Sequence, residues 1–237
     1  GVILFSRNIK NINQALKLTK NIRLILKDNK YPILIDQEGG RVNRLKNIIS
    51  FESLTSEFFG NKYLQSSIEF KSFYKLFIDK TSFLLKSMGI NINTMPVLDL
   101  RVKGASNIIG DRAFSKNPKI VSKIGDICID FFHQNQIGTV MKHIPGHGLA
   151  KVDSHNFTPV VHKKIDYLIK KDFATFKKKK TFFAMTAHII FKNIDNINTV
   201  THSKKLIKLI RSKIGFKNIL ISDDLSMKSL KGSLKQN

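Results

Sequence analysis

The densest group of chemically active side chains lies in one short segment near the middle of the chain. Residues 142–148 read KHIPGHG and residues 153–155 read DSH, so three of the seven histidines fall within fourteen residues. The proline and glycines predict a tightly turning loop, and loops held on a rigid scaffold commonly carry function. The imidazole and carboxylate groups gathered here can transfer protons or bind metal ions.

Three interpretations of this segment are open. The histidines can be solvated loop residues without a chemical role. Zinc could be bound by four side chains, those of His143, His147, Asp153 and His155. Against zinc, the proline and glycine between the first two histidines break the helix that usually presents such a pair, and Lys142 would repel a cation. In the third interpretation, Asp153 orients His155 for general acid–base catalysis, as a carboxylate orients a histidine in many hydrolases.

A second segment, residues 36–44, reads DQEGGRVNR and places two acids and two arginines directly after an apolar run. Three of the seven arginines, Arg41, Arg44 and Arg112, lie in loops of this kind, although 34 of the 41 basic residues are lysine. Arginine at these positions, in a chain that otherwise uses lysine, indicates that the planar guanidinium group with its several hydrogen-bond donors is needed there.

The third segment, residues 222–227, reads SDDLSM and follows the last apolar run. Neighbouring side chains of an extended chain point to opposite sides, so only one of Asp223 and Asp224 is expected to face an active site. An aspartate in that position can be a nucleophile, a base or a metal ligand. The other role expected here is structural, namely helix capping by Asp224 or Ser226.

The net charge of +24 is spread along the whole chain and is carried mainly by lysine. A nucleic-acid groove favours arginine interleaved with exposed aromatic residues, so we expect no nucleic-acid partner. The densest basic run, residues 177–180, is expected to be a solvated helix end. No apolar run approaches the roughly 18 to 20 residues that span a bilayer, so no membrane partner is expected either.

Six short apolar runs alternate with helical patterns and predict the scaffold that positions these groups. Strands are expected over residues 2–5, 32–35, 92–98, 139–142, 182–186 and 219–222. Helices are expected around residues 15–25, 67–88, 120–132, 165–176 and 206–214. Strands joined by helical crossovers form a parallel sheet that is covered by helices.

Two parallel architectures fit this pattern, a doubly wound open sheet and a (β/α)8 barrel. Polar residues follow five different runs: Asp36, Asp99, Lys142 with His143, His188, and Asp223. In a barrel all strand ends converge on one mouth, whereas an open sheet offers only its switch point. Five strand ends carrying chemistry therefore predict the barrel.

Six motifs together resemble the family 3 glycoside hydrolases, and among them the bacterial cytoplasmic β-N-acetylglucosaminidases (β-hexosaminidases) of cell-wall recycling. In chain order they are DQEGGRVNR, PVLDL, IGDRAF, KHIPGHG with DSH, MTAH and SDDLSM. The resemblance covers essentially the whole chain, and KHIPGHG followed by DSH is its most specific part.

The resemblance implies an α/β fold, a (β/α)8 TIM barrel that lacks its first strand and its last βα unit in this chain. Residues 1–237 would then be a single catalytic barrel domain, incomplete at both ends. A cytoplasmic enzyme without cofactor or metal is implied, with a small-molecule sugar as its partner. We expect it to be a monomer.

The resemblance also implies roles for individual residues. Asp223 would be the nucleophile, His155 the acid/base, and Asp153 its orienting partner. Five further residues match positions that hold the N-acetylglucosamine: Asp36, Arg44, Arg112, Lys142 and His143. Their donors and acceptors suit sugar hydroxyl groups.

The implied activity is the removal of terminal N-acetylglucosamine from peptidoglycan fragments, with retention of configuration. The fragments would be N-acetylglucosaminyl-1,6-anhydromuramic acid, with or without peptide. Two alternatives compete with this activity: an inactive or degenerate copy of the same barrel, and a basic nucleic-acid-binding protein. Phosphate in place of water as the acceptor also fits a histidine base.

Overall fold

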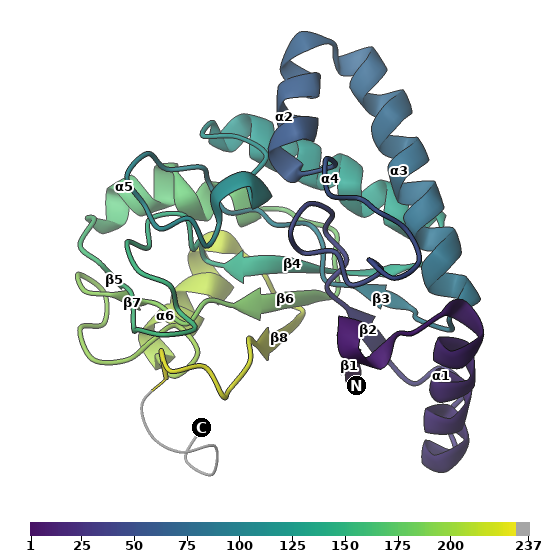
Figure 1. The fold of residues 1–237 in the computed structure, drawn as a ribbon. Helices are drawn as coiled ribbons and strands as arrows, with labels where there is room; N and C mark the ends of the chain where they lie inside the picture. The colour runs from purple at the N-terminus through teal and green to yellow at the C-terminus, as the bar shows by residue number, and fades with distance from the viewer. Residues whose placement is uncertain (231–237) are drawn as a thin grey trace. The chain divides into compact units, whose positions relative to one another are not determined.

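The computed structural model describes residues 1–230, in which strands and helices alternate along the chain (Figure 1). The strands are β1 (Val2–Leu4), β2 (Ile33–Ile35), β3 (Ile92–Asn93), β4 (Gly138–Ile144), β5 (Val160–Val161), β6 (Phe183–Thr186), β7 (Ile190–Phe191) and β8 (Ile219–Ser222). The α-helices are α1 (Ile12–Leu26), α2 (Ser56–Gln65), α3 (Ser67–Ser87), α4 (Pro118–Gln134), α5 (Ile165–Lys170) and α6 (Lys204–Leu209). Within these residues, no helix is long and apolar enough to cross a membrane.

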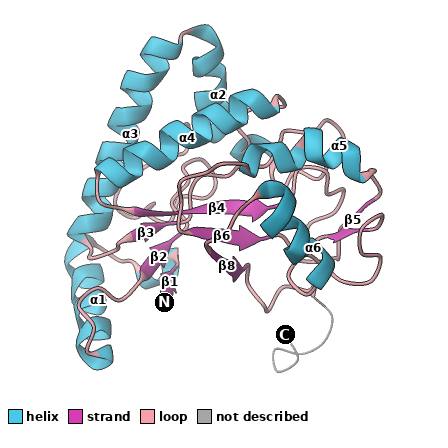
Figure 2. Ribbon diagram, turned by 180° about the vertical axis from the view of Figure 1, so that it is seen from behind, coloured by secondary structure: helices cyan, strands magenta, loops and turns pink. Residues whose placement is uncertain are grey.

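Six of the strands are hydrogen-bonded in the order β1-β2-β3-β4-β6-β8, and β5 pairs with β7 separately. The registers of four pairs are parallel: Val2 with Ile33, Leu34 with Ile92, Ile92 with Gly138, and Phe183 with Ile219. Figure 2 shows these strands in magenta and the intervening helices in cyan. The predicted parallel α/β class is therefore confirmed, and closure into an eight-stranded barrel stays a prediction.

The chain divides into two compact units. Unit 1 comprises Gly1–Pro96 and Ile127–Val140, and unit 2 comprises Val97–Asp126 and Met141–Asn237. Strand β4 and helix α4 each contribute residues to both units. A single catalytic domain over residues 1–237 stays a prediction, and its last seven residues lie outside the described part of the chain.

Three predicted elements differ from the observed ones. The strand expected over 92–98 ends at Asn93, because the Met95 N–H turns back to the carbonyl of Asn93 at 2.9 Å and Pro96 has no N–H to donate, and a single parallel bridge from Val97 to Lys142 follows. The loop expected before residue 67 contains α2, whose start is capped by the Thr55 side chain accepting from the Phe58 N–H at 3.0 Å. The helix expected over 165–176 ends at Lys170, and a 3-10 helix, Asp172–Phe176, follows it.

The lysine run at 177–180 was expected to be solvated, and for Lys179 this is wrong. Its side chain is 1% exposed and donates to Asp126 Oδ1 at 2.9 Å and to Ser122 Oγ at 2.7 Å. The ammonium group is buried with hydrogen-bond partners on α4, which makes its burial tolerable. Lys179 therefore binds a loop of unit 2 to α4, whereas Lys178 and Lys180 are exposed.

Unit 1 is held by aromatic packing between α2 and α3, the hairpin visible in Figure 1. The ring of Phe59 on α2 is 1% exposed and lies 4.5 Å from the ring of Tyr74 and 5.0 Å from that of Phe77, both on α3. Tilted and edge-on aromatic contacts at these separations add to the free energy gained by burying the rings.

Replacing Phe59 by Ala should lower the free energy of unfolding by about 3–5 kcal/mol, because it removes a fully buried ring and leaves a cavity. Chemical denaturation monitored by circular dichroism measures this. The matched control is Phe83→Ala on α3, whose ring is 60% exposed. Equal losses in the two variants would contradict the importance of the α2–α3 contact.

Candidate active site

The carboxylate of Asp99, in the loop that follows β3, is buried in unit 2. Its Oδ2 lies 2.6 Å from Nδ1 of His143 and accepts the His143 backbone N–H at 3.2 Å, and its Oδ1 accepts the His147 backbone N–H at 2.6 Å. Burial acts to raise the pKa of Asp99, but the charge and ring N–H of His143, together with the backbone N–H of His147, hold it below its ordinary value. An ionised Asp99 therefore binds both His143 and His147, the first and last residues of the turn over residues 143–147.

His147 is locked into the same loop and is neutral. Its Nε2 lies 3.0 Å from the hydroxyl oxygen of Ser154, and the residue is buried. Burial, followed by the positive charges of His143 and Arg112, lowers the pKa of His147 to about 4. Arg112, at the end of the 3-10 helix Gly110–Arg112, is thus close enough to the loop to act on it electrostatically.

Asp153 and His155 form the pair that the spacing of the DSH motif predicts. Asp153 Oδ1 lies 2.8 Å from Nδ1 of His155 and accepts the His155 backbone N–H at 2.8 Å. Burial acts to raise the pKa of Asp153, and the N–H groups of His155 bring it below the ordinary value. An ionised carboxylate can only accept, so Nδ1 of His155 carries a proton and its Nε2 is left for acid–base work.

The two aspartates after β8 have different surroundings. Asp224 accepts the backbone N–H of Ser226 at 2.8 Å and its hydroxyl at 2.6 Å, and these two bonds lower the pKa of Asp224. Asp223 is half-buried, and its Oδ1 accepts the backbone N–H of Asp224 at 2.8 Å. Asp224 therefore stabilises a turn, and the expected helix cap is not observed because the described residues after β8 form turns rather than a helix. Its carboxylate has a structural role, which leaves Asp223 as the candidate nucleophile.

The loop that carries His155 is fastened to the segment that follows β8. The carbonyl oxygen of His155 accepts the Lys228 N–H at 3.3 Å, and the Thr158 hydroxyl donates to the carbonyl of Ser229 at 2.8 Å. The charge of His155 also contributes to lowering the pKa of Asp224, next to Asp223. Unit 2 thus brings the predicted acid/base and the predicted nucleophile to one end of its strands.

Lys142 and His143, two of the predicted sugar-binding residues, lie on the carboxyl-terminal part of β4 and are buried. The peptide bond between them is cis, and the carbonyl of Lys142 accepts the N–H of Leu98 at 2.8 Å. Arg112 donates through Nη1 to the carbonyl of Ile108 at 3.1 Å. These three predicted residues therefore belong to unit 2, as do Asp153, His155 and Asp223.

Asp36 and Arg44, the other two predicted sugar-binding residues, belong to unit 1 and pair with each other. Arg44 Nη2 lies 3.5 Å from Asp36 Oδ2, and the Thr94 hydroxyl also donates to Asp36. The turn between them is built by Gln37, whose Oε1 accepts the Arg44 and Leu45 N–H groups at 2.9 and 3.1 Å. The pair thus holds a carboxylate and a guanidinium together at the end of β2.

Gly39 in this turn has φ +93°, and a Cβ atom there would lie 2.2 Å from the carbonyl oxygen of Leu54. Only glycine allows so close a backbone approach at positive φ. The two glycines of the DQEGGRVNR motif are only a weak turn signal in the sequence. The structure shows that Gly39 is required there on steric grounds.

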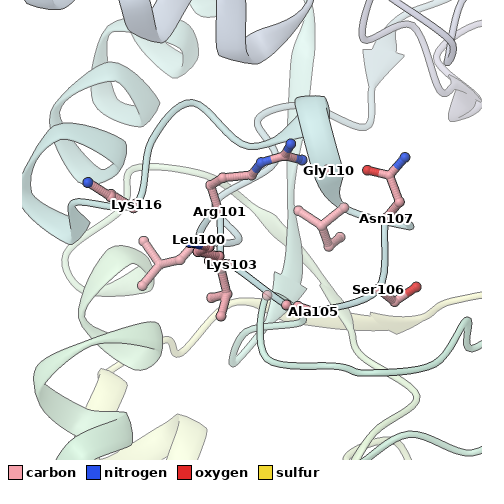
Figure 3. Close-up of a pocket in the computed structure, with 12 residues that line it drawn as sticks. Leu100, Arg101, Lys103, Ala105, Ser106, Asn107, Gly110 and Lys116 are labelled. Carbon is pink, nitrogen blue, oxygen red and sulfur yellow. The ribbon is translucent and has the colours of Figure 1, made fainter.

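Unit 2 contains a cavity of about 340 Å³, whose lining residues are drawn in Figure 3. Its wall is formed by the loop from Leu100 to Gly110, together with Lys116 and Gly148. None of the predicted catalytic or sugar-binding residues lines it. A Cβ on Gly148 would lie 2.3 Å from the carbonyl oxygen of Leu100, so the end of the KHIPGHG motif packs directly against this loop.

The zinc interpretation finds no geometric support, because the three histidines have separate partners. His143 binds Asp99, His147 binds Ser154, and His155 binds Asp153. In residues 1–230 no group of three or more His, Cys, Asp or Glu side chains is arranged to hold a metal ion.

Two contributors were not predicted as site residues. Asp99 stood out only as a polar residue at a strand end, and nothing in its local sequence shows that it binds the loop 44 residues later. Ser154 lies inside the DSH motif, but its contact with His147 depends on the fold of the loop.

A scan against family models matches residues 1–236 to the family described as "Glycosyl hydrolase family 3 N terminal domain". Among curated proteins, a β-hexosaminidase of Thioalkalivibrio sulfidiphilus is 31% identical over 231 residues, which is 96% of this chain and 65% of the relative. A β-hexosaminidase of Hydrogenovibrio crunogenus is 32% identical over 230 residues, covering 96% of this chain and 64% of the relative. The chain thus spans just under two thirds of the length of these relatives.

Solved structures show the same similarity. Native NagZ from Neisseria gonorrhoeae superposes with a TM-score of 0.88 at 28% identity, covering 100% of this chain and 69% of the other. A family 3 β-N-acetylglucosaminidase from Paenibacillus sp. str. FPU-7 gives a TM-score of 0.85 at 28% identity, covering 97% and 44%. The fold is therefore of the TIM-barrel-like α/β type.

Asp172 is a second buried carboxylate beside the KHIPGHG loop, and its environment is the opposite of that of Asp99. A Cβ on Gly146 would lie 2.8 Å from the Asp172 Cβ, and Oδ1 of Asp172 has no hydrogen-bond partner. Burial, with a further contribution from the charge of Asp99, raises the pKa of Asp172 to about 7.

Replacing Asp172 by Asn should stabilise the protein at pH 8 and have little effect on stability near pH 4. The raised pKa means that wild-type stability falls as pH rises from about 4 towards 7, and the neutral amide does not ionise. The gain is at most about 4 kcal/mol, since one pKa unit corresponds to about 1.4 kcal/mol. Denaturation curves at several pH values measure it, with the exposed Asp166→Asn as control. A gain that is the same at pH 4 and pH 8 would contradict this ionisation.

Proposed function

This chain belongs to the glycosyl hydrolase family 3, and from that premise we propose that it acts as a retaining exo-β-N-acetylglucosaminidase. The observation that carries the proposal is the Asp153–His155 pair, whose loop is fastened to the segment that follows Asp223. A carboxylate nucleophile and an oriented proton-transfer group are the two functions that a retaining glycosidase requires.

In the first step, an Asp223 carboxylate oxygen attacks the anomeric carbon and the bond from that carbon to the leaving oxygen breaks. His155 delivers its Nε2 proton to the leaving oxygen, which departs as a hydroxyl group. Asp153 accepts the Nδ1–H throughout and stabilises the positive charge that His155 carries before the transfer. The product of this step is a glycosyl ester on Asp223.

In the second step, water attacks the anomeric carbon and the ester bond to Asp223 breaks. The water proton passes to Nε2 of the neutral His155, which restores the starting state. Most retaining glycosidases use a second carboxylate for this work. A neutral histidine repels an anionic substrate less than a carboxylate does, which suits an acidic aglycone.

The proposed substrate is N-acetylglucosaminyl-1,6-anhydromuramic acid, with or without its peptide. The sugar-binding roles of Asp36, Arg44, Arg112, Lys142 and His143 remain part of the proposal and come from the family resemblance. Their chemistry supports it, because carboxylates accept from sugar hydroxyls while lysine and arginine donate to them. A cytoplasmic location and a monomeric state complete the proposal.

Replacing Asp223 by Asn should lower the turnover of an aryl β-N-acetylglucosaminide roughly 10³-fold or more, because the amide cannot form the glycosyl ester. The matched control is Asp224→Asn, since the Asp224 carboxylate is held by Ser226 and should be dispensable for the chemical step. Turnover that survives in the Asp223 variant would show that Asp223 is not the nucleophile. Absence of turnover in a folded wild-type protein would favour the inactive copy.

Replacing Asp153 by Asn should lower kcat on the order of 10²- to 10⁴-fold with little change in KM, because the amide no longer stabilises a charged His155. Steady-state kinetics with the same aryl substrate separate the two constants. The exposed Asp130→Asn serves as control. An unchanged kcat would show that His155 works without its carboxylate partner.

A further inference from the structure

His188 follows β6 and has no part in the proposed mechanism, although it was one of the strand-end polar residues in the sequence. It is 1% exposed, and both of its ring nitrogens have partners. Nδ1 lies 2.8 Å from the hydroxyl oxygen of Thr201, and Nε2 lies 3.1 Å from the backbone carbonyl oxygen of Asp224. Both partners belong to unit 2.

The partners determine which nitrogen carries the proton. A carbonyl oxygen can only accept, so Nε2 of His188 must be protonated. Burial lowers the pKa of His188, so the ring is neutral at pH 7 and Nδ1 is the acceptor. The Thr201 hydroxyl then donates to Nδ1, and the Thr186 hydroxyl, 2.9 Å from it, donates to Thr201 in turn. The hydrogen-bond chain therefore runs in one direction, from Thr186 to Asp224.

The end of this chain fixes the backbone next to the candidate nucleophile. The carbonyl of Asp224 is held by His188, and the N–H of Asp224 donates to Oδ1 of Asp223 at 2.8 Å. Residue 224 thus connects the imidazole to one oxygen of the Asp223 carboxylate. The hydrogen bond orients this carboxylate and leaves its other oxygen to attack.

We infer that His188 is a positioning residue for the nucleophile, holding the Asp223 carboxylate in its attacking orientation through the carbonyl of Asp224. This inference rests on the proposed function of Asp223. A histidine that merely filled the core would affect stability, and any change in activity would follow the folded fraction. A positioning residue instead affects kcat at constant fold and constant KM.

Two substitutions separate the two nitrogens. In His188→Gln the amide nitrogen can reach the place of Nε2 and donate to the Asp224 carbonyl. In His188→Asn the shorter side chain can still accept from Thr201 in place of Nδ1, but it does not reach Asp224. Both variants lose the ring, and Asn is smaller than Gln by one methylene group. His162→Asn, at an exposed histidine of the same unit, is the control.

We expect kcat of His188→Asn to fall roughly 10- to 100-fold, the range for loss of one orienting hydrogen bond, with KM within about threefold of wild type. His188→Gln should retain kcat within about fivefold of wild type, because the donor to Asp224 is restored. Equal kcat values in the two variants, or a loss confined to KM, would overturn the positioning role while the proposed function stands. Absence of turnover in the folded wild-type protein overturns both together.

A second readout does not depend on turnover. Two-bond ¹H–¹⁵N correlation spectra of histidine-labelled protein distinguish the Nε2–H tautomer from the Nδ1–H tautomer and from the imidazolium. Resonances that are present in the wild-type spectrum and absent from that of His188→Gln belong to His188. At pH 7 they should show the Nε2–H pattern. An Nδ1–H or imidazolium pattern would overturn the hydrogen bond to Asp224, and with it the inference.

Discussion

The buried carboxylate of Asp99 is the group on which the geometry of unit 2 depends. Three N–H groups of the KHIPGHG loop converge on its two oxygens, so the loop cannot move without leaving a buried charge unpaired. Leaving a buried carboxylate without donors costs several kcal/mol, which exceeds what any single loop contact supplies. The positions of His143 and His147 follow directly from this carboxylate.

The same constraint extends to the residues with proposed catalytic roles. His147, fixed by Asp99 through its backbone, contacts Ser154, which stands between Asp153 and His155 in the sequence. The 153–158 loop then contacts the chain after β8 through its bonds to Lys228 and Ser229. The buried carboxylate of Asp99 thus determines, through successive hydrogen bonds, where the proposed acid/base His155 lies relative to the segment of the proposed nucleophile Asp223.

Asp99 and Asp172 show how donors, rather than burial, decide the state of a carboxylate beside this loop. Both are buried, but Asp99 has three N–H donors and a lowered pKa, whereas Asp172 has an unpartnered oxygen and a raised pKa.

Strand β8 and the pairing of Asp153 with His155 were predictable from the sequence, because each depends on neighbouring residues. The contacts of Asp99, Lys179 and His188 were not, because their partners lie 13 to 57 residues away along the chain. Helix α2 was missed although Thr55 offered a capping signal.

Trapping of the glycosyl-enzyme tests the central claim most directly. A 5-fluoro N-acetylglucosaminyl substrate with a good leaving group slows the second step more than the first, so the covalent intermediate accumulates. The account predicts that the intact protein gains the mass of one fluorinated N-acetylglucosaminyl residue, and that peptide mapping places it on Asp223. Release of the leaving group without any mass gain, or an adduct on another residue, would contradict the account.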